Sequence, residues 1–126
     1  MNFNFPKSEK LTSEKEISAL FGKGKRMTLF PIKVLWQPNE RSNHQVLIGC
    51  PKRNMKKAVD RNLIKRRMRE AYRLNKHMLN ELKENDITYF NIAFIFIGNE
   101  IVDSSVIHAK LQKAMEKLIE NCQNHE

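Results

Sequence analysis

Residues 57–76 of the chain read KAVDRNLIKRRMREAYRLNK and belong to the largest predicted element. No glycine or proline interrupts it or the residues up to Glu84, so it predicts one long helix from about Lys57 to about Glu84. Its apolar side chains recur every three or four residues and gather in one arc: Ile64, Met68, Ala71, Tyr72, Met78, Leu79 and Leu82. At about 100° per residue, this arc predicts a face buried against a sheet.

A second arc of the same helix is cationic. It is centred about a third to a half of a turn from the apolar arc and contains Asn62, Lys65, Arg66, Arg69, Arg73 and Lys76. The window Lys52–Lys76 holds eleven of the 23 Lys and Arg and two of the 14 Asp and Glu, so it accounts for the whole net charge of +9. Like charges three or four residues apart destabilise an isolated helix. This cationic stripe therefore predicts a polyanionic ligand.

The composition of the stripe favours folded RNA as that ligand. Proteins that read base sequence mix Asn, Gln, Ser and apolar side chains among their bases, whereas only Asn62 is uncharged here. Arginine adds bidentate contacts to phosphate, and each neutralised phosphate releases condensed counterions. The basic connector before the helix, with Lys52, Arg53, Lys56 and Lys57, leads to a helix N-terminus, which favours an anion again. The sequence thus indicates recognition of RNA backbone and shape.

A short helix and two strands precede the connector. Ser13 and Glu16 form a capping box for the helix, which two glycines end. Alternation over residues 26–37 predicts a strand, with Pro31 at an edge or bulge and one apolar face made of Phe30, Ile32, Val34 and Trp36. A second strand over residues 44–50 is expected to pair with the first as a hairpin.

A further strand and a last helix follow the long helix. The apolar run Tyr89–Ile97 predicts a central strand. Ser104 or Ser105 caps a helix with apolar residues every three or four positions: Ile107, Leu111, Ala114, Leu118 and Cys122. The order of elements predicts an α+β fold, a single domain over residues 1–126 in which helices pack on a small sheet as a two-layer sandwich.

The sequence lacks the residue patterns of a protein catalyst. Asp60 and Glu70, the two acids of the basic window, project about 80° apart on a helix, so they do not converge on a metal ion. The four histidines lie in separate segments without the spacing of a zinc site. No glycine-rich phosphate loop occurs, and neither cysteine has the context of a nucleophile. We expect no catalytic and no metal-binding residue in the chain.

The hydropathy pattern argues against membranes and secretion. No apolar run approaches the ~18 to 20 residues that span a bilayer, and Met1–Lys10 lacks the apolar segment of a signal peptide. Cys50 and Cys122 are far apart and are expected to be reduced, buried thiols. We therefore expect a cytoplasmic protein with an RNA partner and with no membrane or protein partner.

Four residue pairs follow one another along the predicted long helix: Ala58-Val59, Arg61-Asn62, Lys65-Arg66 and Arg69-Glu70. With these pairs, the segment resembles the signature helix of the protein component of bacterial ribonuclease P. Leu63 departs from the signature, because an arginine is ordinary at that position, and Lys56 stands where many members have glycine. The resemblance extends more weakly to the first helix, the chain length and the order of elements, so it spans nearly the whole chain.

The resemblance implies both a fold and a function. The implied fold has the order α-β-β-β-α-β-α, with a third strand ahead of the long helix and a left-handed βαβ crossover, against the usual handedness. The implied function is maturation of transfer RNA, by hydrolysis of the phosphodiester between the 5′ leader and the mature end of a precursor. The RNA subunit would supply the active site and hold the catalytic Mg²⁺ together with the substrate, with the protein as accessory subunit.

The resemblance also implies binding residues. Docking on the RNA subunit is implied for Arg61, Asn62, Lys65, Arg66 and Arg69, and the stripe and connector add Lys52, Arg53, Lys57 and Arg73. The single-stranded 5′ leader is implied to bind in a cleft between the first helix and the sheet, where aromatic side chains stack on bases. Phe21 matches one aromatic position there and Ile17 occupies another. Phe30 and Trp36 are candidates to line the cleft, with a place in the core as the alternative for each.

Three other functions fit parts of the sequence. A ribosomal or assembly protein would use the same stripe on structured RNA without any role in cleavage. A self-sufficient nuclease would need converging carboxylates, which the positions of the acids do not support. A membrane-bound amphipathic helix would need the apolar face that the core requires. The interpretation that the sequence favours is the accessory subunit of an RNA enzyme.

Overall fold

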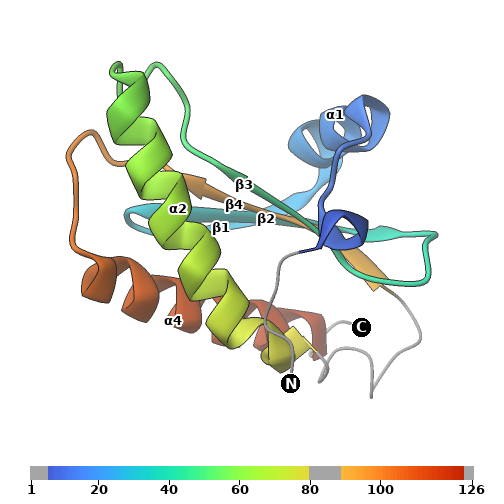
Figure 1. Ribbon diagram of the computed structural model, residues 1–126. Helices are drawn as coiled ribbons and strands as arrows, with labels where there is room; N and C mark the ends of the chain where they lie inside the picture. Colours follow the sequence, from blue (N-terminus) through green and yellow to red (C-terminus); the bar gives the residue numbers. More distant parts are fainter. Residues whose placement is uncertain (1–5, 80–88, 124–126) are drawn as a thin grey trace.

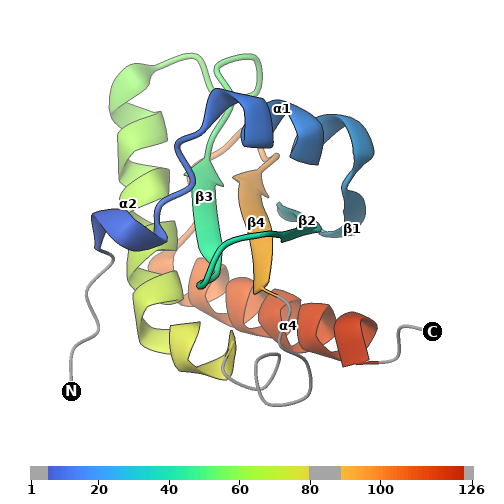
Figure 2. The ribbon, with the colours of Figure 1, turned by 90° about the vertical axis from the view of Figure 1, so that its right-hand side faces the viewer.

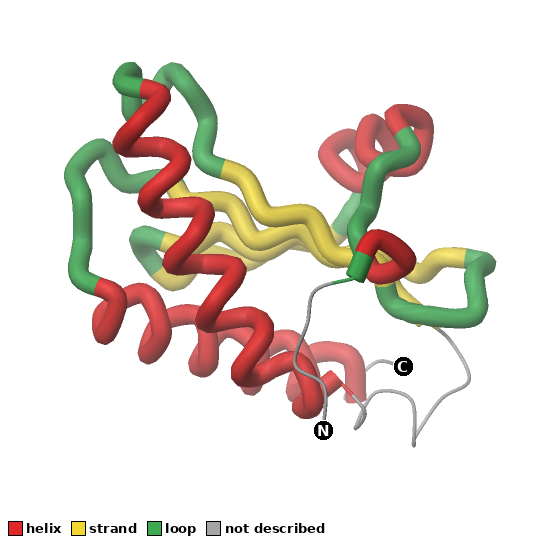
Figure 3. Tube along the Cα trace, in the orientation of Figure 1, coloured by secondary structure: helices red, strands yellow, loops and turns green. Residues whose placement is uncertain are grey.

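The chain forms a four-stranded sheet with helices on both faces (Figures 1 and 3). The computed structural model describes residues 6–79 and 89–123. The sheet has the order β1-β2-β4-β3, with β1 (Lys25–Leu29), β2 (Ile32–Asn39), β3 (Gln45–Gly49) and β4 (Tyr89–Phe96). Within these ranges, the helical elements are η1 (Lys7–Glu9), α1 (Glu14–Lys23), α2 (Ala58–Asn75), η2 (Lys76–Leu79) and α4 (Ser104–Gln123). The α+β class and the order α-β-β-β-α-β-α are confirmed.

The segment expected as one strand over residues 26–37 is in fact two strands. β1 and β2 are antiparallel neighbours, and Phe30 and Pro31 form the turn between them. Proline has no amide hydrogen, so it cannot continue the ladder. The expected hairpin between residues 26–37 and 44–50 is wrong, because β4 lies between β2 and β3. The third strand that the family resemblance implied is present.

β3, α2 and β4 form a crossover of unusual handedness. The two strands are parallel, with Gln45 beside Asn91 and Gly49 beside Ile95. Viewed from the face that α2 and α4 cover, with both strands pointing upward, β4 lies to the left of β3 (Figures 1 and 2). The crossover is therefore left-handed, as the resemblance implied, whereas almost all such units are right-handed.

Each face of the sheet has its own apolar core. α2 and α4 cover one face, where alternate side chains of β2 and β4 are buried: Ile32, Val34, Trp36, Ile92, Phe94 and Phe96. On the other face, Leu20 of α1 packs with Leu35, Ala93 and Ile95 of the sheet and with Leu11. The first core is the expected sandwich of helices on a sheet. The second is small, so α1 is held by few apolar contacts.

The first helix begins and ends as its sequence predicts. The Ser13 hydroxyl accepts a hydrogen bond from the Glu16 amide (3.3 Å). The helix ends at Gly24, whose amide donates to the Leu20 carbonyl (2.9 Å). A Cβ atom at Gly24 would lie 2.5 Å from that oxygen, so the position requires glycine.

The long helix is shorter than its sequence suggests. We expected it to reach Glu84, but α2 ends at Asn75 and a 3₁₀ turn follows to Leu79; the rest of the predicted span lies outside the described residues. Asn75 is buried, and its side-chain amide donates to the Ala71 carbonyl (2.8 Å) and contacts His108 Nε2 (3.3 Å). Such a side-chain bond to the backbone competes with the regular helix. None of the described helices has the length and apolarity to cross a membrane.

Candidate nucleic-acid interface

The predicted cationic stripe forms one surface of α2. Asn62, Arg66 and Arg69 are exposed, and Lys65 is half-buried beside them. Within residues 6–79 and 89–123, no acidic side chain pairs with any of these three cations. The connector adds further exposed cations: Lys52, Arg53 and Lys57. Because unpaired like charges repel at these spacings, a bound anion would offset the repulsion on this surface.

Two acids neutralise the C-terminal end of the stripe. Arg73 Nε donates to the Glu70 carboxylate (3.3 Å), and this pair lowers the pKa of Glu70. Lys76 Nζ lies 3.3 Å from Glu9 Oε1. Both pairs stay in contact with water, where ion pairs add little stability, and they reduce the local positive potential. The strongest positive surface therefore lies on α2 from Asn62 to Arg69 and on the connector.

Two further arginines of α2 bind backbone carbonyls. Arg61 Nη1 donates to the carbonyl oxygens of Met55 (2.9 Å) and Lys56 (2.8 Å), which ties the connector to the helix. Arg67 Nη1 donates to the carbonyl oxygen of Val102, in the loop between β4 and α4. Arg61 is half-buried, so it positions the connector in addition to carrying charge. Nothing in the sequence pattern distinguishes this role from that of its neighbours.

The Cys50 thiol shows where the stripe lies relative to the sheet. Cys50 directly follows β3, and burial raises the pKa of its thiol, while the charges of Arg61 and Lys65 act to lower it. Both side chains therefore lie close to the end of β3. Cys122 is half-buried, and burial raises the pKa of its thiol to about 11. Both cysteines are free thiols; the expected burial is confirmed for Cys50 and is wrong for Cys122.

α1 covers only part of its side of the sheet. It stands over one end of the sheet, and the N-terminal half of α2 rises at the other end (Figure 1). We call four residues on the α1 side of the sheet the open face: Lys33, Leu47 and Ile95 of the strands, and Ile97 directly after β4. Ile95 is 8% exposed, and the other three are half-buried. Apolar surface bordered by cations suits a single-stranded nucleic acid, whose bases stack while its phosphates pair with charge.

Two of the four predicted cleft residues lie beside the open face. Ile17 and Phe21 are one helical turn apart, so they share a flank of α1. Ile17 packs against the same apolar cluster as Leu47 and Ile97, and Phe21 is 40% exposed. Lys33 was not predicted. The signal was present, because Lys33 alternates with the buried face of β2 and must point to the α1 side.

The other two, Trp36 and Phe30, do not lie beside α1. Trp36 is 6% exposed and packs in the core under α2 and α4, because it shares the alternation of Ile32 and Val34. Phe30 is 65% exposed in the turn between β1 and β2, at the end of the hairpin remote from α1, because the strand stops at Pro31. Their assignment to the cleft is wrong. For Trp36, the alternative of a core residue holds.

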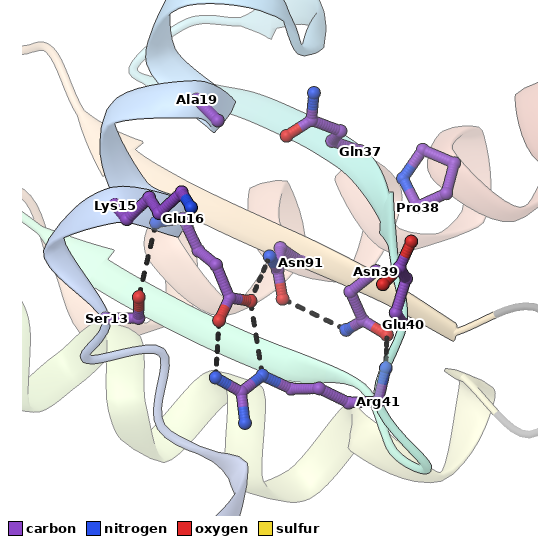
Figure 4. A pocket seen from close by; sticks show the side chains of 10 residues that line it. All are labelled: Ser13, Lys15, Glu16, Ala19, Gln37, Pro38, Asn39, Glu40, Arg41 and Asn91. Carbon is purple, nitrogen blue, oxygen red and sulfur yellow. Dashed lines mark hydrogen bonds and ion pairs between the residues drawn. The ribbon is translucent and has the colours of Figure 1, made fainter.

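A polar pocket of about 440 Å³ lies on the other flank of α1 (Figure 4). Its lining includes Glu16 and Ala19 of α1, Arg41 of the loop between β2 and β3, and Asn91 of β4. Hydrogen bonds from Arg41 and then from Asn91 lower the pKa of the Glu16 carboxyl, which stays ionised near neutral pH. The pocket is therefore organised around a charged carboxylate that already has partners.

The interface as a whole is suited to binding. Within the described ranges, no group of three or more His, Cys, Asp or Glu side chains could hold a metal ion. The candidate interface has guanidinium and ammonium groups and the Asn62 amide on α2 and the connector, and the apolar open face on the α1 side of the sheet. These groups recognise phosphates and bases, and they do not form a general acid and base pair.

Comparison with known proteins identifies the family. The family model described as Ribonuclease P matches residues 5–123, which include the stripe, the connector and the open face. The chain belongs to the ribonuclease P protein family. The ribonuclease P protein component of Porphyromonas gingivalis strain W83 is 36% identical over 124 residues, covering 94% of this chain and 89% of that protein. The component of Chlorobium phaeobacteroides is 39% identical over 103 residues, covering 73% of this chain and 70% of that protein.

Solved ribonuclease P proteins share the fold. The Staphylococcus aureus protein superimposes with a TM-score of 0.70 at 19% identity, covering 89% of this chain and 96% of that chain. The Thermotoga maritima protein gives a TM-score of 0.70 at 24% identity, covering 86% of this chain and 96% of that chain. The family resemblance stated from the sequence is thus confirmed for the fold.

The structure shows the positions of two residues that depart from the ribonuclease P signature, Leu63 and Lys56. Leu63 is half-buried and lies about 60° around the helix from Arg66, at the edge of the stripe. With leucine in place of the arginine that is ordinary at this position, the stripe carries one positive charge fewer. Lys56 is exposed in the connector, and no described residue, glycine included, has a positive φ, so lysine fits this backbone without strain.

Proposed function

We propose that this protein acts as the accessory subunit of ribonuclease P, binding the catalytic RNA and the 5′ leader of precursor tRNA to promote endonucleolytic removal of the leader. Membership of the family supports the assignment to ribonuclease P. The observation that carries the binding role is the cationic surface of Lys65, Arg66 and Arg69 on α2, which has no acidic partner in the part of the chain that the structure describes.

The RNA subunit is proposed to dock on the stripe. Arg66 and Arg69 are exposed, one turn apart and without acidic partners among the described residues, so each is available to a phosphate. Lys65 and Asn62 flank them, and the connector adds Lys52, Arg53 and Lys57. Each phosphate contact releases counterions, so the binding free energy depends strongly on salt. Arg61 and Arg73 contribute less, because carbonyls and Glu70 already engage them.

The 5′ leader is proposed to bind along the open face. Phe21 offers an aromatic ring that is 40% exposed, and Ile17 offers apolar contact one turn before it. Lys33 places a positive charge on the same side of the sheet. A leader strand there would stack a base on Phe21 and run toward the cations of α2. This arrangement separates the leader from the surface that holds the RNA subunit.

Hydrolysis is assigned to the RNA subunit. The described part of the chain has no cluster of carboxylates that fits Mg²⁺, so the catalytic ion is proposed to be held by the RNA subunit and the substrate. The protein contributes positive charge, which brings together two polyanions that repel each other. Its help is therefore greatest when Mg²⁺ is scarce.

The test is cleavage of a labelled precursor tRNA at low Mg²⁺. A bacterial ribonuclease P RNA alone, this protein alone and the mixture are compared. We expect cleavage at the mature 5′ end only in the mixture, and we expect the double variant R66A/R69A to require more Mg²⁺. The matched control is K113A/K117A, which removes two exposed charges from α4, outside the stripe, the connector and the open face.

Two outcomes would refute the proposal. If the mixture cleaves no better than the RNA alone although the protein binds RNA, the protein is a structured-RNA-binding protein without a role in cleavage. If the protein alone cleaves the precursor, it is a nuclease in its own right. Equal losses for R66A/R69A and K113A/K117A would show that total charge matters and that the stripe has no special role.

A further inference from the structure

The first turn of α1 is joined to the sheet through the carboxylate of Glu16. Arg41 Nε donates to Glu16 Oε1 (3.2 Å), and the Arg41 Nη2 atom bonds Oε2, so the contact is bidentate. Asn91 Nδ2 donates to the same Oε1 (2.9 Å). Figure 4 shows the guanidinium and the amide converging on this carboxylate from different elements. One side chain thus connects α1, the loop between β2 and β3, and β4.

The partners of Glu16 are themselves fixed. Asn91 is 3% exposed, and its Oδ1 atom accepts from Asn39 Nδ2 (3.0 Å). Asn39 Oδ1 accepts from the Arg41 amide (2.9 Å), which closes the network into a ring. Asn39 Nδ2 also reaches the Asn43 carbonyl (3.3 Å) and so braces the loop that carries Arg41. A buried amide with satisfied donors and acceptors is costly to move, so the network specifies one position for Glu16.

α1 depends on this network because its apolar contact is small. Leu20 is its only fully buried side chain, and Ile17 adds a partly buried contact to the same cluster. At the other end, Arg26 Nη2 donates to the Phe21 carbonyl (2.8 Å). Glu16 and Phe21 are therefore held from opposite ends of α1, and the two anchors fix the flank that carries Ile17 and Phe21.

We infer that Arg41 is a positioning residue for the 5′ leader: by holding Glu16, it fixes the Ile17 and Phe21 flank of α1 against the open face. This inference rests on the proposed leader site. Arg41 does not contact the leader, because it lies on the pocket side of α1 and its guanidinium is engaged by Glu16. Arg41 keeps the ring of Phe21 at one height above the sheet before the leader binds. The binding free energy of the leader is then not reduced by the entropy lost on ordering that ring.

The experiment measures binding of precursor tRNA, with and without a leader, to the complex reconstituted from a bacterial ribonuclease P RNA and this protein. Arg41→Ala is expected to weaken the binding of leader-bearing precursor about two- to fivefold. This is the range that the loss of one solvent-accessible ion pair produces. Affinity for leaderless tRNA and for the RNA subunit should not change. Arg41→Lys keeps the positive charge and one contact with Glu16. Its affinity for leader-bearing precursor should therefore lie between those of the wild type and Arg41→Ala. Lys113→Ala is the charge-matched control and should match the wild type.

A double variant separates positioning from charge masking. If Arg41 served only to neutralise Glu16 near an anionic leader, Glu16→Gln in the Arg41→Ala background would restore affinity. Positioning predicts no restoration, because the glutamine has lost the guanidinium that held it. Restoration, or equal losses for leaderless and leader-bearing tRNA, would overturn the inference. If the wild-type complex itself does not distinguish the two substrates, the proposed leader site fails first, and the inference fails with it.

Discussion

The guanidinium of Arg61 donates a hydrogen bond to the backbone carbonyl of Met55, at 2.9 Å. Met55 is buried, so this bond fastens the connector to the core at the point where α2 begins. A second bond reaches the carbonyl of Lys56 at 2.8 Å. Arg61 therefore sets the shape of the cationic surface, in which the exposed charges of the connector stand next to those of the helix.

Arg61→Ala is expected to destabilise the fold. The loss of two charge-assisted hydrogen bonds at a half-buried site should lower the free energy of unfolding by about 1 to 2 kcal/mol. Arg66→Ala, at an exposed position without such bonds, should change it by less than about 0.5 kcal/mol. Urea denaturation of both variants measures the difference. Equal effects would mean that the carbonyl contacts of Arg61 add nothing.

Arg66→Ala and Arg69→Ala are each expected to remove one phosphate contact. The slope of log K against log salt for the RNA subunit should fall by ~0.7 to 0.9 in magnitude for each variant. Arg73→Ala should change the slope less, because Glu70 already offsets its charge. Binding titrations at several salt concentrations give the slopes. Unchanged slopes for Arg66→Ala and Arg69→Ala would place the RNA on another surface.

Phe21→Ala is expected to weaken the leader contact selectively. Loss of one stacked base should cost about 1 kcal/mol or more in affinity for leader-bearing precursor. Affinity for the RNA subunit should stay unchanged, because Phe21 lies on the other side of the sheet from the core under α2. Phe30→Ala is the matched control, since Phe30 is an exposed aromatic at the far end of the hairpin. Equal losses in both binding assays would indicate misfolding.

The Glu16 network predicts a pH dependence of stability. Hydrogen bonds from Arg41 and then Asn91 lower the pKa of Glu16 below its usual value of 4.5. A group with a lowered folded-state pKa stabilises the fold above its unfolded-state pKa, and this contribution is lost as the pH falls through the folded-state value. The stability difference between the wild type and Glu16→Gln should therefore shrink from about pH 6 to about pH 3. Denaturant titrations at the two pH values test it, and a constant difference would show that the ionised carboxylate is not the stabilising species.

Local patterns were enough to predict the helices and the cationic stripe. The capping box at Ser13, the apolar arc from Ile64 to Tyr72 and the concentration of charge each depend on residues a few positions apart. For the same reason, the α+β class and the family resemblance followed from the sequence. The order of strands in the sheet depends on which strands pair after the chain has folded. The alternation of residues within one strand does not determine its pairing partner.

The errors at the candidate site have the same origin. The alternation of Ile32, Val34 and Trp36 was recognised, but alternation alone does not say which face of the sheet α1 covers. Trp36 was therefore assigned to the wrong layer, and Lys33, on the opposite side of the strand, was missed. Arg61 bonds to backbone carbonyls of the connector, and Arg41 bonds to the carboxylate of Glu16, 25 residues away in the sequence. No local residue pattern predicts either contact.

Photocrosslinking from two positions tests the separation of the two RNA surfaces most directly. A benzophenone side chain is placed at position 66 on α2 or at position 21 on α1, in the complex with a ribonuclease P RNA and a precursor tRNA. Position 66 is predicted to crosslink to the RNA subunit, and position 21 to nucleotides of the 5′ leader. Crosslinks from position 21 to the RNA subunit alone, or from position 66 to the leader, would contradict the proposed arrangement.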